Sequence, residues 1–316
     1  MSDNESATLS PEEAFAVLGN ETRLTVLETL AVADGPLTYS ELFDRIEYDD
    51  SANYSYHLDK LVGHFVRKTD EGYEIEDAGR RVVEAVLSGA VTETPRIEPT
   101  TTDHRCPFCS APIEVEFRDG RVELNCTECP GFKQFSSPGD RRFTEYGTLG
   151  FFYFPPAGTR GRSAASVLDA AWTWRHVDFV ADSSGVCSRC SAPLEHSVTV
   201  CADHDTVEET CEQCGRRYAA RFEGYCTNCN YEYNAIAPGC LLDDTDLLAF
   251  LASHGVNPLT PDEINQALGT LTDYEEEVVS TEPFKANFTF TIGDETLTLT
   301  VGEGLEVIDT ERRTVS

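Results

Sequence analysis

Apolar side chains recur every three or four residues through much of residues 10–92, which is the spacing of amphipathic helices. The pattern predicts four short helices in succession, over residues 11–18, 20–33, 38–46 and 51–63. Ser10 and Glu13, and likewise Thr38 and Glu41, have the spacing of capping boxes. A capping box marks the first turn of a helix, because each side chain satisfies a free backbone N–H group.

The period then changes from helical to alternating. Residues 65–68 and 73–75 flank residues 69–72, a polar turn that ends in glycine, and this arrangement predicts a β-hairpin. Apolar positions over residues 82–87 predict one more helix. The order of helix, helix, short helix, longer helix, hairpin and helix is typical of a winged helix-turn-helix domain.

Residues 10–88 resemble the ArsR-type winged-helix transcriptional regulators of archaea. Three segments carry the resemblance: Leu18-Gly19-Asn20-Glu21-Thr22-Arg23-Leu24, Ser55-Tyr56-His57-Leu58-Asp59-Lys60-Leu61, and Gly72-Tyr73-Glu74-Ile75 with Ala78-Gly79. In that family the helix that corresponds to residues 51–63 enters the DNA major groove, the hairpin lies beside it as the wing, and dimers form through the outer helices. The resemblance therefore implies double-stranded DNA as a partner and a homodimer as the active form.

Helical geometry selects the side chains that would meet DNA. On the recognition helix the exposed candidates are Ser51, Asn53, Ser55, Tyr56 and Lys60. On the wing the candidates for phosphate contact are Arg67, Lys68 and Thr69. An asparagine such as Asn53 can read adenine through two hydrogen bonds. We expect Tyr54, His57 and Leu58 to belong to the core instead.

Twelve cysteines are present, and their spacing indicates metal binding. Ten form five Cys-x-x-Cys pairs: Cys106/Cys109, Cys126/Cys129, Cys187/Cys190, Cys211/Cys214 and Cys226/Cys229. Cys201 and His204 have the same spacing, with an imidazole in place of one thiolate. Two ligands separated by two residues lie on one tight turn and can bind the same tetrahedral ion. We expect two to three zinc ions, and we expect Cys240 to be a small buried residue.

The first two cysteine pairs enclose a predicted hairpin. Alternating residues over 113–117 and 122–124 flank Asp119-Gly120, a strong hairpin signal. This hairpin would bring the two pairs together as a zinc ribbon spanning residues 93–135. Four thiolates leave no open coordination position, so we expect a structural role. The threonine- and proline-rich residues 91–103 are predicted to form a linker.

The later pairs form a second zinc module over residues 185–234 and allow two schemes. Sequential pairing joins Cys187/Cys190 with Cys201/His204, and Cys211/Cys214 with Cys226/Cys229. Nested pairing joins Cys187/Cys190 with Cys226/Cys229, and Cys201/His204 with Cys211/Cys214. Two antiparallel strands, around residues 194–200 and 218–222, with a metal at each end favour the nested scheme. His204 either completes a site or is solvated and leaves a three-cysteine site or none.

The remaining segments carry less information. Residues 136–184 form a connector with an aromatic cluster and a helix over residues 163–180, and the cluster comprises Phe143, Tyr146, Phe151, Phe152, Tyr153 and Phe154. We expect these rings to pack against the neighbouring ribbon, the alternative being a ligand pocket. Within residues 235–316 the pattern predicts a helix around residues 247–251, a helix start at Thr260-Pro261-Asp262-Glu263, and a hairpin of residues 288–292 and 297–301 that residues 305–308 extend.

Taken together, the predicted elements describe an α+β, multidomain chain. The winged helix-turn-helix spans residues 1–92, and the ribbon, the connector, the second zinc module and a C-terminal region of helix and strands follow it. No run of about 18 apolar residues occurs, and the N-terminus is polar. We therefore expect a soluble, cytoplasmic protein without a membrane partner.

The charge balance is strongly acidic. The 316 residues include 24 Lys and Arg against 56 Asp and Glu, a formal net charge of −32. Only four residues are lysine, and such a composition resembles that of halophilic archaea. Molar salt shortens the Debye length to about 3 Å, so a dense anionic surface repels itself far less there than in dilute buffer. The competing interpretation is a surface that mimics an acidic partner.

These observations lead to a DNA-binding regulator as the first hypothesis. A second is a basal transcription accessory factor that contacts RNA polymerase or another transcription protein, since a winged helix and a zinc ribbon also occur together in such a factor. A third is a thiol-based redox sensor that releases zinc. We expect no enzymatic activity, because no Ser/His/Asp arrangement, no phosphate loop and no metal site with a vacancy is recognisable.

Overall fold

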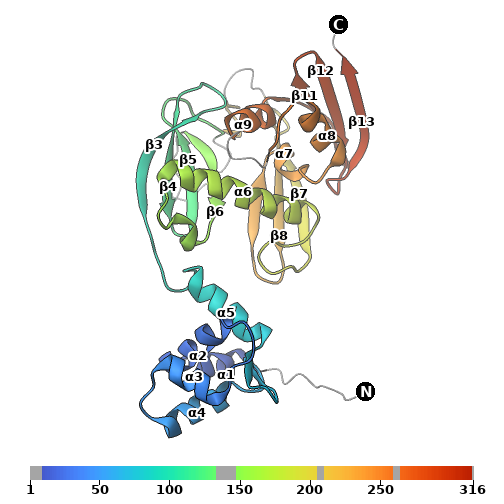
Figure 1. Cartoon of the computed structure of the whole chain (residues 1–316). Helices are drawn as coiled ribbons and strands as arrows, with labels where there is room; N and C mark the ends of the chain where they lie inside the picture. Colours follow the sequence, from blue (N-terminus) through green and yellow to red (C-terminus); the bar gives the residue numbers. More distant parts are fainter. Residues whose placement is uncertain (1–8, 133–146, 205–209, 259–263, 315–316) are drawn as a thin grey trace. The chain divides into compact units, whose positions relative to one another are not determined.

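In the computed structural model, the described residues are 9–132, 147–204, 210–258 and 264–314 (Figure 1). They divide into two compact units, residues 1–93 and 94–316. Each unit buries a hydrophobic core of its own. The α+β, multidomain class predicted from the sequence is confirmed. Among the described helices, none is long and apolar enough to cross a membrane.

The first unit has the element order of a winged helix-turn-helix. Its elements are α1 (Pro11–Leu18), α2 (Glu21–Ala31), α3 (Tyr39–Ile46), α4 (Ser51–Leu61), β1 (Val66–Lys68), β2 (Tyr73–Ile75) and α5 (Asp77–Leu87). Both predicted capping boxes are present, at Ser10 with Glu13 and at Thr38 with Glu41. Asp50 caps α4 by accepting from two backbone N–H groups of its first turn. These local contacts explain why each helix begins where it does.

The wing is built by backbone pairing. Val66 pairs with Ile75 and Lys68 with Tyr73, and Leu37 adds a bridge to Tyr73 as a third strand. Gly72 makes this bridge possible: its φ is +145°, and a Cβ there would lie 2.4 Å from the carbonyl oxygen of Leu37. Any side chain at this position would therefore push the bridging strand away from the hairpin.

Helix α2 lies at the centre of this unit and packs against α3, α4 and α5. The core includes Leu27, Leu42, Tyr54 and Leu61, all with no exposed surface. The ring of Tyr54 makes edge contacts with the aromatic rings of α3, which fixes the helix-turn-helix angle through buried contacts.

The second unit contains three antiparallel sheets. Their strands are β3 (Ile97–Arg105), β4 (Pro112–Arg118), β5 (Arg121–Cys126) and β6 (Thr148–Tyr153) in the first; β7 (Leu194–Val200), β8 (Ala220–Cys226) and β9 (Glu232–Ala235) in the second; and β10 (Tyr274–Thr281), β11 (Phe284–Ile292), β12 (Glu295–Val301) and β13 (Val307–Thr314) in the third. The helical elements are η1 (Pro156–Thr159), α6 (Ala164–Ser183), α7 (Ala237–Cys240), α8 (Thr245–Ser253) and α9 (Ile264–Thr272). Helix α6 packs against the first sheet and against α7 (Figure 1).

Several local predictions are confirmed in this unit. Asp119 and Gly120 form the turn of the β4–β5 hairpin, both with positive φ. The C-terminal hairpin is β11–β12, and β13 extends it. Phe152 is buried, and its ring makes an edge contact with Trp172 of α6. It also lines a cavity, which is the alternative that the sequence left open.

One prediction is wrong, and others concern residues outside the described ranges. The linker predicted over residues 91–103 is a strand from Ile97 onward, because β3 pairs with β4 and so completes the edge of the first sheet. The polar sequence of β3 hides this, since almost all of its side chains are exposed or half-buried. Strand β10 was not predicted. The predicted helix start at residues 260–263 and the aromatics Phe143 and Tyr146 lie outside the described residues.

Candidate metal centres and nucleic-acid interface

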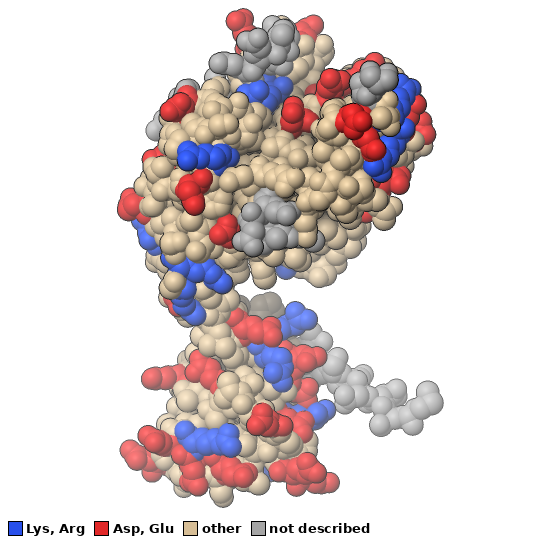
Figure 2. Space-filling model, turned by 45° about the horizontal axis from the view of Figure 1, so that its top comes forward, with Lys and Arg blue, Asp and Glu red and all other residues tan. Residues whose placement is uncertain are grey.

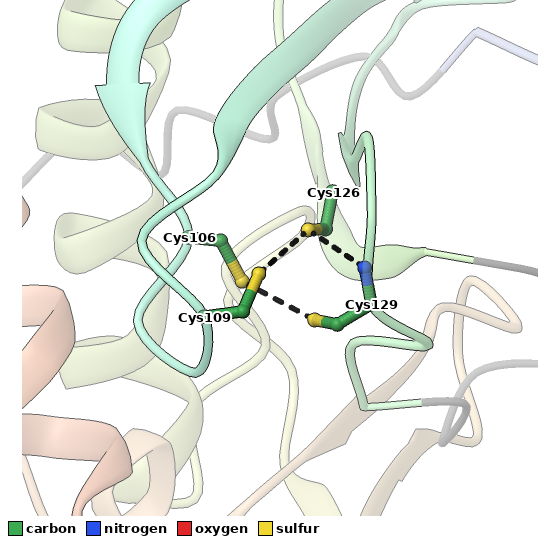
Figure 3. A group of neighbouring side chains, drawn as sticks. All are labelled: Cys106, Cys109, Cys126 and Cys129. Atoms are coloured by element: carbon green, nitrogen blue, oxygen red, sulfur yellow. Dashed lines mark hydrogen bonds between the residues drawn. The ribbon is translucent and has the colours of Figure 1, made fainter.

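The first ribbon brings four thiols to one point (Figure 3). The Sγ atoms of Cys106 and Cys129 are 3.5 Å apart, and those of Cys109 and Cys126 are 3.4 Å apart. A tetrahedral Zn²⁺ with Zn–S bonds of about 2.3 Å requires sulfur separations of about 3.8 Å. The thiols therefore have nearly the spacing that such an ion imposes.

Hydrogen bonds from the backbone hold the sulfurs in place. Cys126 Sγ accepts from the N–H groups of Glu128 and Cys129, at 3.4 and 3.3 Å. Such bonds favour the thiolate form that binds metal. The second pair comes directly from the end of β5, so the Asp-Gly hairpin sets the position of two of the four ligands.

Four of the cysteine pairs share one backbone turn. In each, the N–H of the residue after the second cysteine donates to the carbonyl of the first cysteine, at 2.8 to 3.0 Å. That residue has a positive φ in every case: Ser110, Ser191, Gly215 and Asn230. The turns that begin at Cys106, Cys187, Cys211 and Cys226 are therefore one structural unit that occurs four times among the described residues.

The second cluster follows the nested pairing. It contains Cys187, Cys190, Cys226 and Cys229, with Sγ separations of 3.7 Å between Cys187 and Cys229 and 3.6 Å between Cys190 and Cys226. The side-chain amide of Asn228 lies 3.4 Å from Cys190 Sγ and lowers the pKa of that thiol to about 6. A thiolate is thus available near neutral pH.

The third cluster contains the only imidazole among the described metal-ligand groups: Cys201, His204, Cys211 and Cys214. Nδ1 of His204 lies 3.5 Å from Cys214 Sγ, while Nε2 lies 3.2 Å from the carbonyl oxygen of Arg217. Because Nε2 must donate to that carbonyl, Nδ1 keeps its lone pair for a metal ion. The geometry therefore places His204 where it can complete a four-ligand site with the three cysteines.

Strand pairing explains why the nested scheme holds. Strands β7 and β8 are antiparallel, with Leu194 opposite Cys226 at one end and Val200 opposite Ala220 at the other. The second cluster lies at the first end and the third cluster at the other. Three groups with four ligands each use every residue predicted to bind metal. Each group offers the four ligands that a tetrahedral ion takes.

A buried ion-pair network that the sequence did not reveal ties the second cluster to α6. Asp182 accepts from the backbone N–H of Ser188 at 3.1 Å, and Asp178 lies 3.2 Å from the guanidinium of Arg189. Arg175 lies 3.3 Å from Asp182 and completes the network. Because Ser188 and Arg189 lie between the two cysteines of one pair, α6 positions this pair directly. Charged residues on an otherwise apolar helix were the available signal.

The recognition helix presents the predicted polar face. Ser51, Asn53, Tyr56 and Lys60 are exposed and Ser55 is half-buried. Tyr54, His57 and Leu58 are buried, as predicted. The side-chain amide of Asn53 donates to the hydroxyl of Tyr48 at 2.8 Å, a contact that was not foreseen. Nζ of Lys60 lies over the ring of Tyr56 at 5.5 Å from its centre, so both side chains project from one side of α4.

Both cations predicted on the wing, Arg67 and Lys68, contact neighbouring side chains. The guanidinium of Arg67 is 2.6 Å from Glu74 and 3.6 Å from Glu76, and these carboxylates raise the pKa of Arg67. Nζ of Lys68 lies over the ring of Tyr73. Thr69 is half-buried and accepts from the N–H of Glu71 within the turn. Of the three predicted wing contacts, Lys68 is therefore the exposed cation that forms no ion pair with a carboxylate of the described residues.

Two family models match the chain. One, described as a domain of unknown function (DUF7351), covers residues 103–307, and the other, described as a domain of unknown function (DUF7347), covers residues 11–86. No curated protein and no solved structure matches the chain. The two matches fall within the two compact units, so each model corresponds to one unit.

Proposed function

The chain belongs to the family of the domain of unknown function DUF7351, and we propose that it is a DNA-binding transcriptional regulator of the ArsR type. In this proposal the first unit binds promoter DNA as a homodimer. The second unit holds three zinc ions, and it acts in the cytoplasm, where thiols stay reduced.

The two faces of α4 are the observation that carries the proposal. Tyr54, His57 and Leu58 point into the core, while Asn53 and Lys60 are exposed on the opposite side. A helix with a buried apolar face and a free polar face, next to a wing, is what major-groove recognition requires. Neither Asn53 nor Lys60 has a role in the hydrophobic core, which leaves both available for a partner.

Exposed apolar residues on the outer elements support a homodimer. Phe15 of α1 is 76% exposed, Leu87 of α5 is 55% exposed, and Val91 just after α5 is 71% exposed. Single exposed apolar residues are common, so these three support the proposal only because they lie on the outer elements through which a second copy would bind. The family that the sequence resembles forms dimers through these helices.

The metal chemistry supports a structural role. Two sites offer four thiolates and the third offers three thiolates and an imidazole, and both ligand sets are typical of structural zinc. Bound zinc would supply cross-links between the ends of strands, in addition to the apolar core of this unit. We therefore propose no catalytic activity for these centres.

The test is a footprint on the promoter of its own gene with the full-length protein in molar potassium chloride. We expect a saturable site with two-fold symmetry, and we expect the double variant Asn53→Ala, Lys60→Ala to weaken binding at least tenfold at unchanged zinc content. Lys285→Ala removes an exposed cation from the second unit and is the matched control, with expected wild-type binding.

Three outcomes would redirect the proposal. Absence of any saturable site would contradict it. Co-purification with RNA polymerase without promoter selectivity would favour the basal accessory factor. Loss of DNA affinity when peroxide releases zinc would add a redox-sensing role, and unaltered affinity after release would exclude that role.

A further inference from the structure

A cavity of about 100 Å³ lies in the second unit, and its lining contains none of the ligands of the three metal clusters. Its walls come from β6, α6, β9, α7 and α9, and they include Phe152, Trp172, His176, Phe179 and Leu271. One water needs only about 10–15 Å³, while an apolar cavity of roughly 150 Å³ binds benzene. The space is therefore several times what one water needs and about two thirds of the volume of that benzene-binding cavity.

The walls are mainly aromatic and aliphatic. Trp172 makes edge contact with Phe152 and a tilted contact with His176, at 6.1 and 4.7 Å between ring centres. Phe179 lies 6.1 Å from His176 in an edge arrangement. Rings that meet at such angles leave their faces and edges for a further aromatic ring, which prefers the same geometries.

His176 supplies one polar atom. The side chain is 3% exposed, and Nδ1 is 2.8 Å from the carbonyl oxygen of Trp172, to which it must donate. Burial lowers the pKa of His176 to about 4, so the ring is neutral at physiological pH. Nε2 is then an acceptor, and none of the hydrogen bonds among the described residues reaches it. An acceptor in this state can take a hydrogen bond from a ligand or a water.

The one cation at the cavity is already neutralised. Arg175 lies 3.3 Å from Asp182 and 3.9 Å from Asp178, and its guanidinium stacks on Phe179 at 3.7 Å. The hydroxyl of Tyr231 accepts from it as well, at 3.3 Å. An anionic ligand would have to displace these buried carboxylates, so the site disfavours a negative charge.

We propose that this cavity is a binding site for a small, uncharged aromatic molecule with one hydroxyl or N–H group, which donates to Nε2 of His176. The ring of the ligand packs among Phe152, Trp172 and Leu271. The proposal concerns the second unit alone and does not depend on DNA binding by the first.

The test uses phenol, toluene and benzoate with the full-length protein in molar potassium chloride, followed by saturation-transfer NMR and calorimetry. We expect saturable binding of phenol with a Kd in the millimolar range or below. Toluene should bind about tenfold more weakly, which is the effect of one lost hydrogen bond, and benzoate should not bind. Tighter binding of benzoate than of phenol, or no saturable binding of phenol, would overturn the proposal.

The variant His176→Phe keeps an apolar ring but removes the acceptor. It should lose about tenfold in phenol affinity while toluene binding stays unchanged. His254→Phe is the matched control, because Nδ1 of His254 makes the same bond to the carbonyl of Phe250, also at 2.8 Å, yet His254 does not line the cavity. Equal loss of phenol affinity in both variants would contradict the site.

A second measurement covers the case in which His176→Phe does not fold. In wild-type protein labelled with ¹⁵N at histidine, phenol should move the Nε2 resonance of His176 and leave that of His254 in place. An unmoved Nε2 resonance at saturating phenol would overturn the assigned hydrogen bond. The variant Leu271→Phe, which fills the cavity, should weaken phenol and toluene alike.

Discussion

A single backbone carbonyl determines how the third metal cluster is assembled. Arg217 O holds Nε2 of His204, and the imidazole therefore turns Nδ1 toward the three thiols. A hydrogen bond at the ring nitrogen that does not bind metal sets the tautomer of a ligating histidine and holds its ring in position. The role of His204 thus depends on the backbone position of Arg217 as well as on the spacing Cys-x-x-His.

We expect His204→Ala to reduce the metal content of the full-length protein from three ions per chain to two, because three thiolates alone bind zinc less tightly. Elemental analysis after gel filtration measures this directly. His204→Cys restores a fourth ligand and should keep three ions. An unchanged content in His204→Ala would show that the imidazole is not a ligand.

The wing offers a second prediction for a single residue. Glu74 holds Arg67 at 2.6 Å and competes with DNA phosphate for the same guanidinium. Glu74→Gln should therefore raise DNA affinity. It should also steepen the plot of the logarithm of the binding constant against the logarithm of salt concentration by up to about one unit of slope, which is the contribution of one phosphate contact. The matched control is Glu98→Gln, which breaks the Arg96–Glu98 pair of the second unit and should change neither quantity. The opposite sign would mean that Arg67 does not reach DNA.

His176 makes the second unit sensitive to acid. Its pKa of about 4 in the folded protein lies below the usual 6.5, so the unfolded state takes up a proton first as the pH falls. Stability should decrease between about pH 6.5 and pH 4, by on the order of 3 kcal/mol in total. Urea unfolding of the wild type and of His176→Phe at each pH gives two free energies of unfolding. Their difference isolates the contribution of His176, since the other titratable groups are common to both proteins. Parallel pH profiles would contradict it.

At the scale of the elements, turns and bridges decide how helices and strands combine. The wing needs Gly72, whose missing side chain lets Leu37 pair with Tyr73. The four cysteine turns need a residue with positive φ after the second cysteine, which Ser110, Ser191 and Asn230 adopt along with a glycine. In each case one backbone conformation makes a contact between distant elements possible.

We expect Gly72→Ala to destabilise the wing by about 2 kcal/mol or more, because the added Cβ would meet the carbonyl of Leu37 at 2.4 Å. Native-state hydrogen exchange of the full-length protein should show faster exchange at the amides of Leu37 and Tyr73. Gly35→Ala is the control, since a Cβ there has no neighbour within 4 Å and exchange should be unchanged. Equal protection in both variants would show that the bridge tolerates the displacement.

At the scale of the whole molecule, two units stabilise themselves by different means. The first has an apolar core and contains none of the metal-ligand groups found among the described residues. The second has three clusters of metal ligands together with a larger core. Acidic side chains lie on the visible surface of both units, and basic side chains are interspersed among these acidic ones (Figure 2).

Removal of metal should therefore act on one unit only. We expect a strong chelator to abolish hydrogen-exchange protection in β4–β5 and β7–β8, where the clusters lie, and to leave α2 and α4 protected. The measurement is residue-resolved exchange before and after chelation of the full-length protein. Restored zinc should return the protection. Simultaneous loss of protection in α2 would mean that the first unit depends on the second.

Features formed by residues a few positions apart could be predicted from the amino-acid order alone. Capping boxes, the Asp-Gly turn and the Cys-x-x-Cys pairs were predicted correctly, because each is formed by local backbone geometry. The face of α4 was also predictable, since helical spacing sorts buried Tyr54 from exposed Asn53.

Which distant residues meet depends on the packing of elements against one another. Cys187 lies 42 positions from Cys229, and Arg175 lies 56 from Tyr231. The predicted strands favoured the nested pairing of cysteines, but the cysteine spacing alone allowed both schemes, and no pattern indicated the contact between Arg175 and Tyr231. Strand β3 is polar and exposed, so it forms only because β4 supplies its hydrogen bonds. The nested pairing, the network on α6 and the cavity at His176 follow from packing between elements, which depends on contacts that sequence spacing does not encode.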